Sequence, residues 1–222
     1  PDHLPRAHDP DEQVLALAGC VDIVGIDARE QQLVGFAATV VDDRVVADVL
    51  ADEVEVGSGT AFELVRAAVP WQAERRQMWD SVVDVPRLTC FYRTGEALPL
   101  DLLVQARDRL SAHYREELGE DFTSAGCCLY RDGRDSVAWH GDTIGRGATH
   151  DTMVAILSLG TARALCLRPR GGGRTAYRLP LGHGDLAVMG GSCQRTWEHA
   201  VPKTAKPVGP RISVQFRPRG VA

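Results

Sequence analysis

Two histidines and one aspartate have the types and spacing of a metal site. His140 and Asp142 form an H-x-D sequence at the end of a predicted strand, 136–140. Side chains two residues apart project from the same face of a strand, so one ion could bind both of them. His199 follows later, and two imidazoles with one carboxylate leave positions open on the other side of an ion. This arrangement is suited to non-haem Fe(II) and oxygen chemistry, and zinc is an alternative with the same ligands.

A strictly alternating segment follows the second histidine. From Arg211 to Arg217, polar side chains share one face of a predicted strand and Ile, Val and Phe share the other. One interpretation is a strand with a solvated outer face, and the other is a barrel strand whose polar face lines a ligand cavity. In the cavity, two arginines would bind a dicarboxylate through bidentate, charge-assisted hydrogen bonds. A zinc site alone gives no reason for this arginine pair.

Taken together, these segments resemble the AlkB family of Fe(II)- and 2-oxoglutarate-dependent dioxygenases. Residues 129–142 are similar to its Y-x-D-G-x-D-x-x-x-x-H-x-D segment, and residues 183–191 to its G-D-[LV] strand. Residues 199–202 match its H-x-[LIV]-P sequence, and Arg211 with Arg217 match its closing R-x5-R. The segments occur in the family's order, and the resemblance covers about two thirds of the chain, residues 69–219.

The resemblance implies a fold and a metal site. The expected fold is α+β, a double-stranded β-helix (jelly-roll) core with buttressing helices. The resemblance also implies Fe(II) and 2-oxoglutarate as cofactors, with O2 as co-substrate. The implied iron ligands are His140, Asp142 and His199.

The resemblance also assigns a pocket for 2-oxoglutarate. Arg211 would pair with its distal carboxylate, Tyr130 would donate a hydrogen bond to that carboxylate, and Arg217 would lie near the other carboxylate and the metal. Cys128 and Ser213 occupy positions where the family has asparagine, so we expect them in the pocket with altered polar contacts.

For the substrate, the resemblance implies N-alkylated bases of DNA or RNA, which are hydroxylated on the alkyl carbon and released from it. The candidate substrate residues are Arg87, Tyr92 and Trp79, near a segment similar to the family's substrate lid, and Ile144. Ile144 stands where base-repairing members usually carry an acidic residue, which leaves the base preference open. A protein side chain or small metabolite is the alternative substrate, and a non-catalytic jelly-roll that binds a partner is the alternative from another class.

The elements that must position these residues follow from periodicity and turn residues. Thr60 is a candidate N-cap for a helix over 61–68, and apolar spacing predicts a second helix over 100–118 that ends at Gly119. After residue 126 the period changes to two, with Gly- and Pro-rich joints, as in an antiparallel sandwich or barrel. The predicted strands are 21–24, within a strand or strand–helix mixture, and 127–130, 136–140, 152–158, 164–167, 176–179, 186–189 and 212–216.

Composition bounds the class of protein. The 222 residues are 44% hydrophobic and 25% charged, ordinary globular values. Acidic residues concentrate in the first 130 residues and arginines after them, within a net charge of −5, so we expect only local contacts with nucleic acid. The arginine-rich composition is typical of a high-GC bacterial genome. With no signal peptide, no apolar membrane span and no paired cysteine motif, we expect a cytoplasmic monomer with reduced thiols. We divide the chain into an acidic N-terminal extension, 1–56, and an AlkB-like domain, 57–222.

Overall fold

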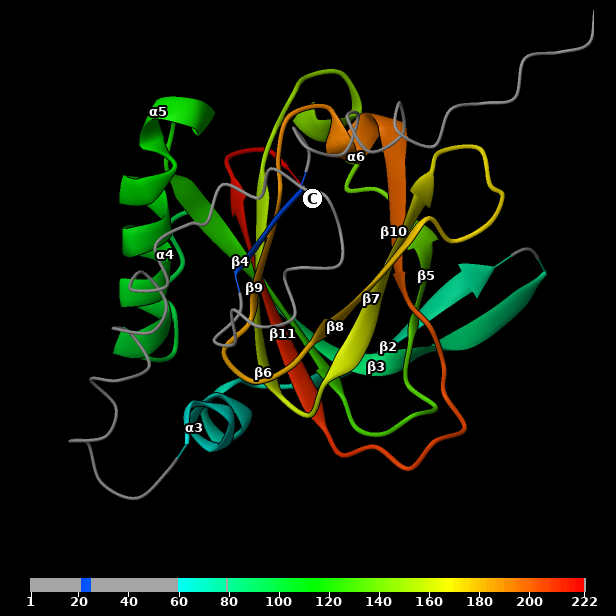
Figure 1. The fold of residues 1–222 in the computed structure, drawn as a ribbon. Helices are drawn as coiled ribbons and strands as arrows, with labels where there is room; N and C mark the ends of the chain where they lie inside the picture. Colours follow the sequence, from blue (N-terminus) through cyan, green and yellow to red (C-terminus); the bar gives the residue numbers. More distant parts are fainter. Residues whose placement is uncertain (1–20, 25–59, 79, 222) are drawn as a thin grey trace, which may run out of the picture.

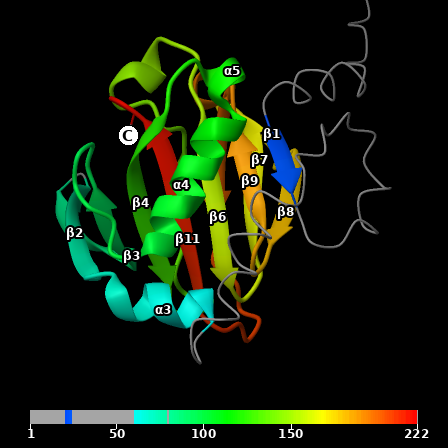
Figure 2. The same ribbon diagram turned by 90° about the vertical axis from the view of Figure 1, so that its left-hand side faces the viewer.

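The computed structural model describes residues 21–24, 60–78 and 80–221, and the statements below concern these residues. Two antiparallel β-sheets face each other, and helices cover the outer face of the larger sheet (Figures 1 and 2). This arrangement confirms the predicted α+β jelly-roll with buttressing helices. In the described part of the chain, no helix has the length and apolar character needed to cross a membrane.

The larger sheet carries the arginine-rich strand at its centre, and the smaller sheet carries the two histidines. The larger sheet has the order β1 (Val21–Val24), β9 (Leu186–Met189), β6 (Val154–Gly160), β11 (Arg211–Pro218), β4 (Phe122–Tyr130), β3 (Ser81–Tyr92) and β2 (Gln72–Met78). The smaller sheet has the order β5 (Val137–His140), β10 (Trp197–Val201), β7 (Arg163–Pro169) and β8 (Tyr177–Leu181).

Every strand predicted from alternation is present, with bounds that differ by a few residues. The sequence did not predict β2, β3 or β10. The β2 sequence, QAERRQM, lacks an apolar face because β2 is an edge strand paired only with β3. Strand β10, WEHAV, is short and buried at four of its five positions, so it lacks the alternation of buried and exposed residues that marks a half-buried strand.

Helix α3 (Ala61–Ala68) confirms its predicted bounds, and the Thr60 hydroxyl accepts a hydrogen bond from the Glu63 N–H at 3.3 Å. The single helix predicted over 100–118 is wrong in one respect. It is interrupted at Tyr114, whose φ of −93° and ψ of 9° separate α4 (Asp101–His113) from α5 (Arg115–Leu118). The predicted end is correct: Gly119 adopts a left-handed φ of 74°. Two short helices complete the set, η3 (Arg146–Ala148) and α6 (Cys193–Thr196).

The two faces of β11 lie in different environments. Ile212, Val214 and Phe216 are fully buried in a core between the larger sheet and helices α3 and α4. The polar face looks toward the smaller sheet, where a second core contains Tyr130 and Trp197. Arg211 and Ser213 are only 2% and 3% exposed, so the interpretation as a solvated outer face is wrong.

Strand β1 lies within the predicted N-terminal extension and pairs with β9 of the larger sheet. The rest of that extension lies outside the described residues. The boundary between residues 56 and 57 therefore stays a prediction.

Candidate active site

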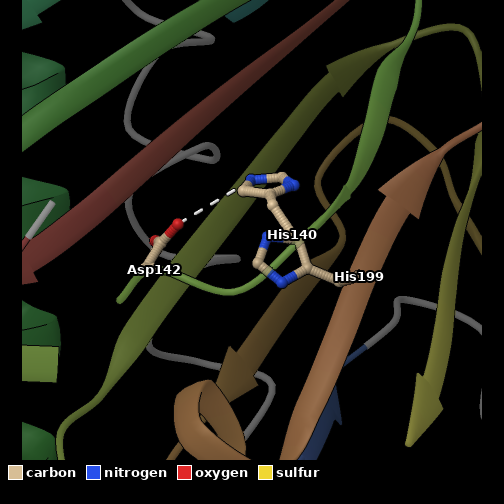
Figure 3. A group of neighbouring side chains, drawn as sticks. All are labelled: His140, Asp142 and His199. Atoms are coloured by element: carbon tan, nitrogen blue, oxygen red, sulfur yellow. Dashed lines mark ion pairs between the residues drawn. The ribbon is translucent and has the colours of Figure 1, made fainter. Parts of the chain in front are cut away.

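The two histidines and the aspartate meet at one end of the smaller sheet (Figure 3). His140 ends β5, and His199 is its direct cross-strand partner on β10. Their ring centroids are 4.2 Å apart. Asp142 follows β5 by two residues, and its Oδ1 lies 3.8 Å from His140 Nε2. One nitrogen from each ring and one carboxylate oxygen all lie within 4.8 Å of one another, so this group could hold a metal ion.

The protein orients each of these donors. His140 Nδ1 lies 2.8 Å from the Ala138 carbonyl oxygen, so Nδ1 carries the proton and Nε2 keeps its lone pair. Burial, with smaller contributions from His140 and Arg217, outweighs the opposing charge of Asp142 and lowers the pKa of His199 to about 3. His199 is therefore a neutral imidazole near neutral pH, which is the form that binds a metal.

Asp142 is held from two sides. Arg217 Nε donates to its Oδ2 at 2.8 Å, which leaves Oδ1 facing His140. The side-chain oxygen of Gln194, on α6, accepts a hydrogen bond from the Asp142 backbone N–H at 2.9 Å. Burial raises the pKa of Asp142, but the charge and hydrogen bond of Arg217, together with the histidines once they are protonated in acid, outweigh it and lower the pKa to about 2. The carboxylate is thus ionised and fixed in orientation.

Two glycines allow these contacts. A Cβ at Gly141 would lie 2.5 Å from the Gln194 carbonyl oxygen, so the H-x-D segment fits against α6 only without a side chain. A Cβ at Gly126, on β4, would lie 2.8 Å from Arg217 Nη1. Arg217 therefore crosses over a glycine to reach Asp142.

Arg211 is a buried cation on the same face of β11 as Arg217, and we call the polar residues on this face of β4 and β11 the pocket. Arg211 Nε donates to the Ser158 hydroxyl at 2.8 Å, and its guanidinium carbon lies 5.6 Å from the centre of the Tyr130 ring. Among the described residues, no carboxylate lies within ion-pairing distance of Arg211. Burial lowers the pKa of Arg211, which Asp185 attracts only at longer range, and burial raises the pKa of Tyr130. Within the described part of the chain, a buried arginine without an ion-pair partner thus lies beside a neutral phenol. A buried cation of this kind favours an anionic ligand.

The register of β4 and β11 brings the predicted cofactor residues together. Arg211 lies directly opposite Tyr130, and Ser213 lies directly opposite Cys128. The Cys128 thiol lies 3.9 Å from Gln215 Oε1, and the Ser213 hydroxyl accepts from Gln215 Nε2. These positions, predicted from separate motifs, form one wall of the pocket.

The predicted substrate residues do not form one group. Ile144 is 74% exposed, two residues after Asp142. Arg87 lies inside, beside Cys128 and Tyr130. Tyr92 packs against the core under the helices, on the opposite face of β3 from Phe91, and its hydroxyl is buried there near the Cys90 thiol. Trp79 lies outside the described residues.

Sequence reasoning missed two residues near the site. Gln194 is 1% exposed and holds the Asp142 backbone, and a polar residue in the short segment before the distal histidine was the only available signal. Phe91 is 44% exposed and lies against the position that a Gly126 Cβ would occupy, next to Arg217. Alternation along β3 could have placed Phe91 on the pocket side.

Comparison with protein families gives a match over most of the described chain. Residues 67–217 match the family model of the 2OG-Fe(II) oxygenase superfamily. The matched segment contains His140, Asp142, His199, Arg211 and Arg217.

Curated relatives match over a similar span. Alpha-ketoglutarate-dependent dioxygenase alkB homolog 3 of Bos taurus is 31% identical over 188 residues, which cover 72% of this chain and 63% of that protein. DNA oxidative demethylase ALKBH2 of Arabidopsis thaliana is 28% identical over 195 residues, covering 72% and 62%. The chain thus spans less than two thirds of the length of these relatives. The solved structure of OsALKBH1 aligns with 80% of this chain and 92% of that chain at 14% identity and a TM-score of 0.49.

Proposed function

Because the chain belongs to the 2OG-Fe(II) oxygenase superfamily, as an AlkB-family member, we propose that it oxidatively removes alkyl groups from nucleic-acid bases. The family assignment confirms the prediction of an oxidoreductase that uses Fe(II) and 2-oxoglutarate with O2. The names of two relatives, a dioxygenase of the alkB type and a DNA oxidative demethylase, support alkylated nucleic acid as the substrate.

The donor set fits iron. His140 Nε2, one oxygen of Asp142 and a ring nitrogen of His199 would hold it, as a triad that leaves positions open for ligands. When bound, iron and 2-oxoglutarate supply the oxidising chemistry that hydroxylates the alkyl carbon.

The remaining residues would bind 2-oxoglutarate and orient the metal ligands. Arg211 would pair with the distal carboxylate of 2-oxoglutarate, because it is a buried guanidinium that lacks a carboxylate partner among the described residues. Tyr130, held neutral by burial, can donate its hydroxyl proton to the same carboxylate. Arg217 keeps Asp142 ionised and turned toward His140. The buried Arg211, which lacks a carboxylate partner among the described residues and shares the polar face of β11 with Arg217, is the observation that carries the proposal.

The test is mass spectrometry on iron-loaded protein with 2-oxoglutarate, oxygen and short oligonucleotides. Each oligonucleotide carries one lesion, either 1-methyladenine, 3-methylcytosine or an etheno adduct. We expect loss of one methylene from a methylated base, or of the etheno bridge, with formation of succinate. His140→Ala, the control, should show neither change.

The exposed Ile144 favours one alternative, a protein side chain or a small metabolite as substrate. An acidic side chain that could bind the exocyclic amine of a base is absent at this position. Succinate formed by the native protein, without any change in the oligonucleotides, would support this alternative and contradict the proposed substrate.

A further inference from the structure

Arg87 lies next to the pocket of the oxo-acid. Leu88 pairs with Leu129 in the antiparallel register of β3 and β4, which puts Arg87 on the same side of the sheet as Tyr130 and Cys128. Its guanidinium interacts with the Cys128 thiol and with Tyr130. This is the wall that also carries Arg211 and Ser213.

The hydrogen bonds of Arg87 leave part of its guanidinium free. Nη1 donates to the Ser136 carbonyl oxygen at 3.2 Å, which fixes the side chain under the connection between β4 and β5. Nε is buried and has no hydrogen-bond partner among the described residues. No ion pair of Arg87 occurs in the described residues, although Glu74 attracts it at longer range. An arginine held in this way has charge and donor capacity for a ligand.

Cys128 cannot replace the charge of Arg87 in this part of the pocket. A thiol is a weak hydrogen-bond donor, so the strong positive charge in this corner of the pocket comes from Arg87. Arg87 is only partly buried, and a guanidinium keeps its positive charge at any pH the protein meets.

We propose that Arg87 serves the 2-oxoglutarate pocket and not the nucleic-acid surface. It supplies a second positive charge beside Cys128 and Tyr130, which adds to that of Arg211 in attracting the dianionic oxo-acid. The inference rests on the proposed placement of 2-oxoglutarate at Arg211.

The test separates the two ligands. 2-Oxoglutarate is titrated by calorimetry into Mn(II)-loaded native protein, Arg87→Met and Arg87→Lys. The same proteins are tested by fluorescence anisotropy against a single-stranded oligonucleotide that contains one 1-methyladenine. We expect Arg87→Met to weaken 2-oxoglutarate binding about tenfold, because one charge-assisted interaction is lost. Arg87→Lys should keep most of the affinity, and neither variant should change oligonucleotide binding.

Two results would overturn the proposal: unchanged 2-oxoglutarate affinity in Arg87→Met, or a loss of oligonucleotide affinity in either variant. Arg93→Met removes an exposed arginine just after the same strand and should leave both affinities unchanged. Arg211→Met distinguishes this inference from the proposed function. If Arg211→Met also keeps full 2-oxoglutarate affinity, the placement of the oxo-acid itself is wrong. If only Arg87→Met keeps full 2-oxoglutarate affinity, the error is confined to the role of Arg87. Thermal unfolding shows whether Arg87→Met is folded. If it is not, the 2-oxoglutarate affinity of Arg87→Lys is compared with that of Arg93→Lys instead.

Discussion

The charged groups of the pocket are buried, whereas the side chains at its outer rim, Phe91 and Ile144, are exposed. Asp142 and Arg211 are 5% and 2% exposed, but Phe91 and Ile144 are 44% and 74% exposed. Asp142 is held by Arg217 of β11 and by Gln194 of α6, and Arg211 is held by Ser158 of β6. Substitutions of these buried groups should destabilise the protein, because a buried polar group left without a partner costs free energy. Substitutions at the exposed rim should cost less stability than substitutions in the buried pocket.

The largest effect of a substitution is expected at Arg211, in the buried pocket. Arg211→Met keeps the volume but removes the charge, and we expect 2-oxoglutarate affinity to fall about 100-fold, because a buried charge-assisted pair is lost. Metal should stay bound, since Arg211 is not among the three candidate ligands. Calorimetry with 2-oxoglutarate and metal analysis of the same sample measure the two effects. Full 2-oxoglutarate affinity in Arg211→Met would contradict the placement of 2-oxoglutarate at Arg211.

A smaller effect is expected at Gln194. Gln194→Met removes the acceptor for the Asp142 backbone N–H but retains a similar shape. We expect metal affinity to fall about 30-fold, as is typical when a group that orients a ligand is lost. Competition of Mn(II) with a chelating dye gives this affinity. Gln194→Glu keeps the acceptor oxygen and should retain more metal affinity than Gln194→Met, and the reverse order would refute the positioning role.

Asp135 tests the part of the pocket wall that follows Tyr130. Burial raises the pKa of its carboxyl, but hydrogen bonds from the Arg131 side chain and backbone outweigh this effect and leave the pKa below its ordinary value. A lowered folded-state pKa stabilises the protein above the unfolded-state pKa of about 4, and this contribution disappears as pH falls through the folded-state pKa.

We expect Asp135→Asn to lower the free energy of unfolding by about 1.5 kcal/mol at about pH 6. The difference from the native protein should shrink toward zero at a pH below the lowered folded-state pKa, where the native carboxyl becomes protonated as well. Urea unfolding at both pH values measures it. A difference that stays constant with pH would show that the Arg131 pair is not the cause.

Much of the pocket could be predicted from the sequence, and little of the rim. The alternation from Arg211 to Arg217 is strict because one face packs under α3 and α4 and the other lines the pocket, so both faces are constrained. The β2–β3 hairpin carries no such pattern, because its edge strand is largely solvated. Arg87 shows the limit within one strand: its place near a segment similar to the family's substrate lid suggested a substrate contact, and only the register with β4 revealed that it lies beside Cys128.

The smallest effect is expected at the rim itself. An exposed aromatic next to Arg217 offers a flat apolar surface on which a planar base can stack. Phe91→Ala should raise the KM for a methylated oligonucleotide about fivefold, since stacking of one base at an exposed site is worth about 1 kcal/mol. The affinities for metal and 2-oxoglutarate and the thermal stability should not change, because Phe91 contributes to neither core cluster. Phe91→Tyr, which keeps the ring, is the matched control and should retain the native KM. If Phe91→Ala weakens 2-oxoglutarate binding as much as it raises KM, rim and pocket are one unit, and the separation between them does not hold.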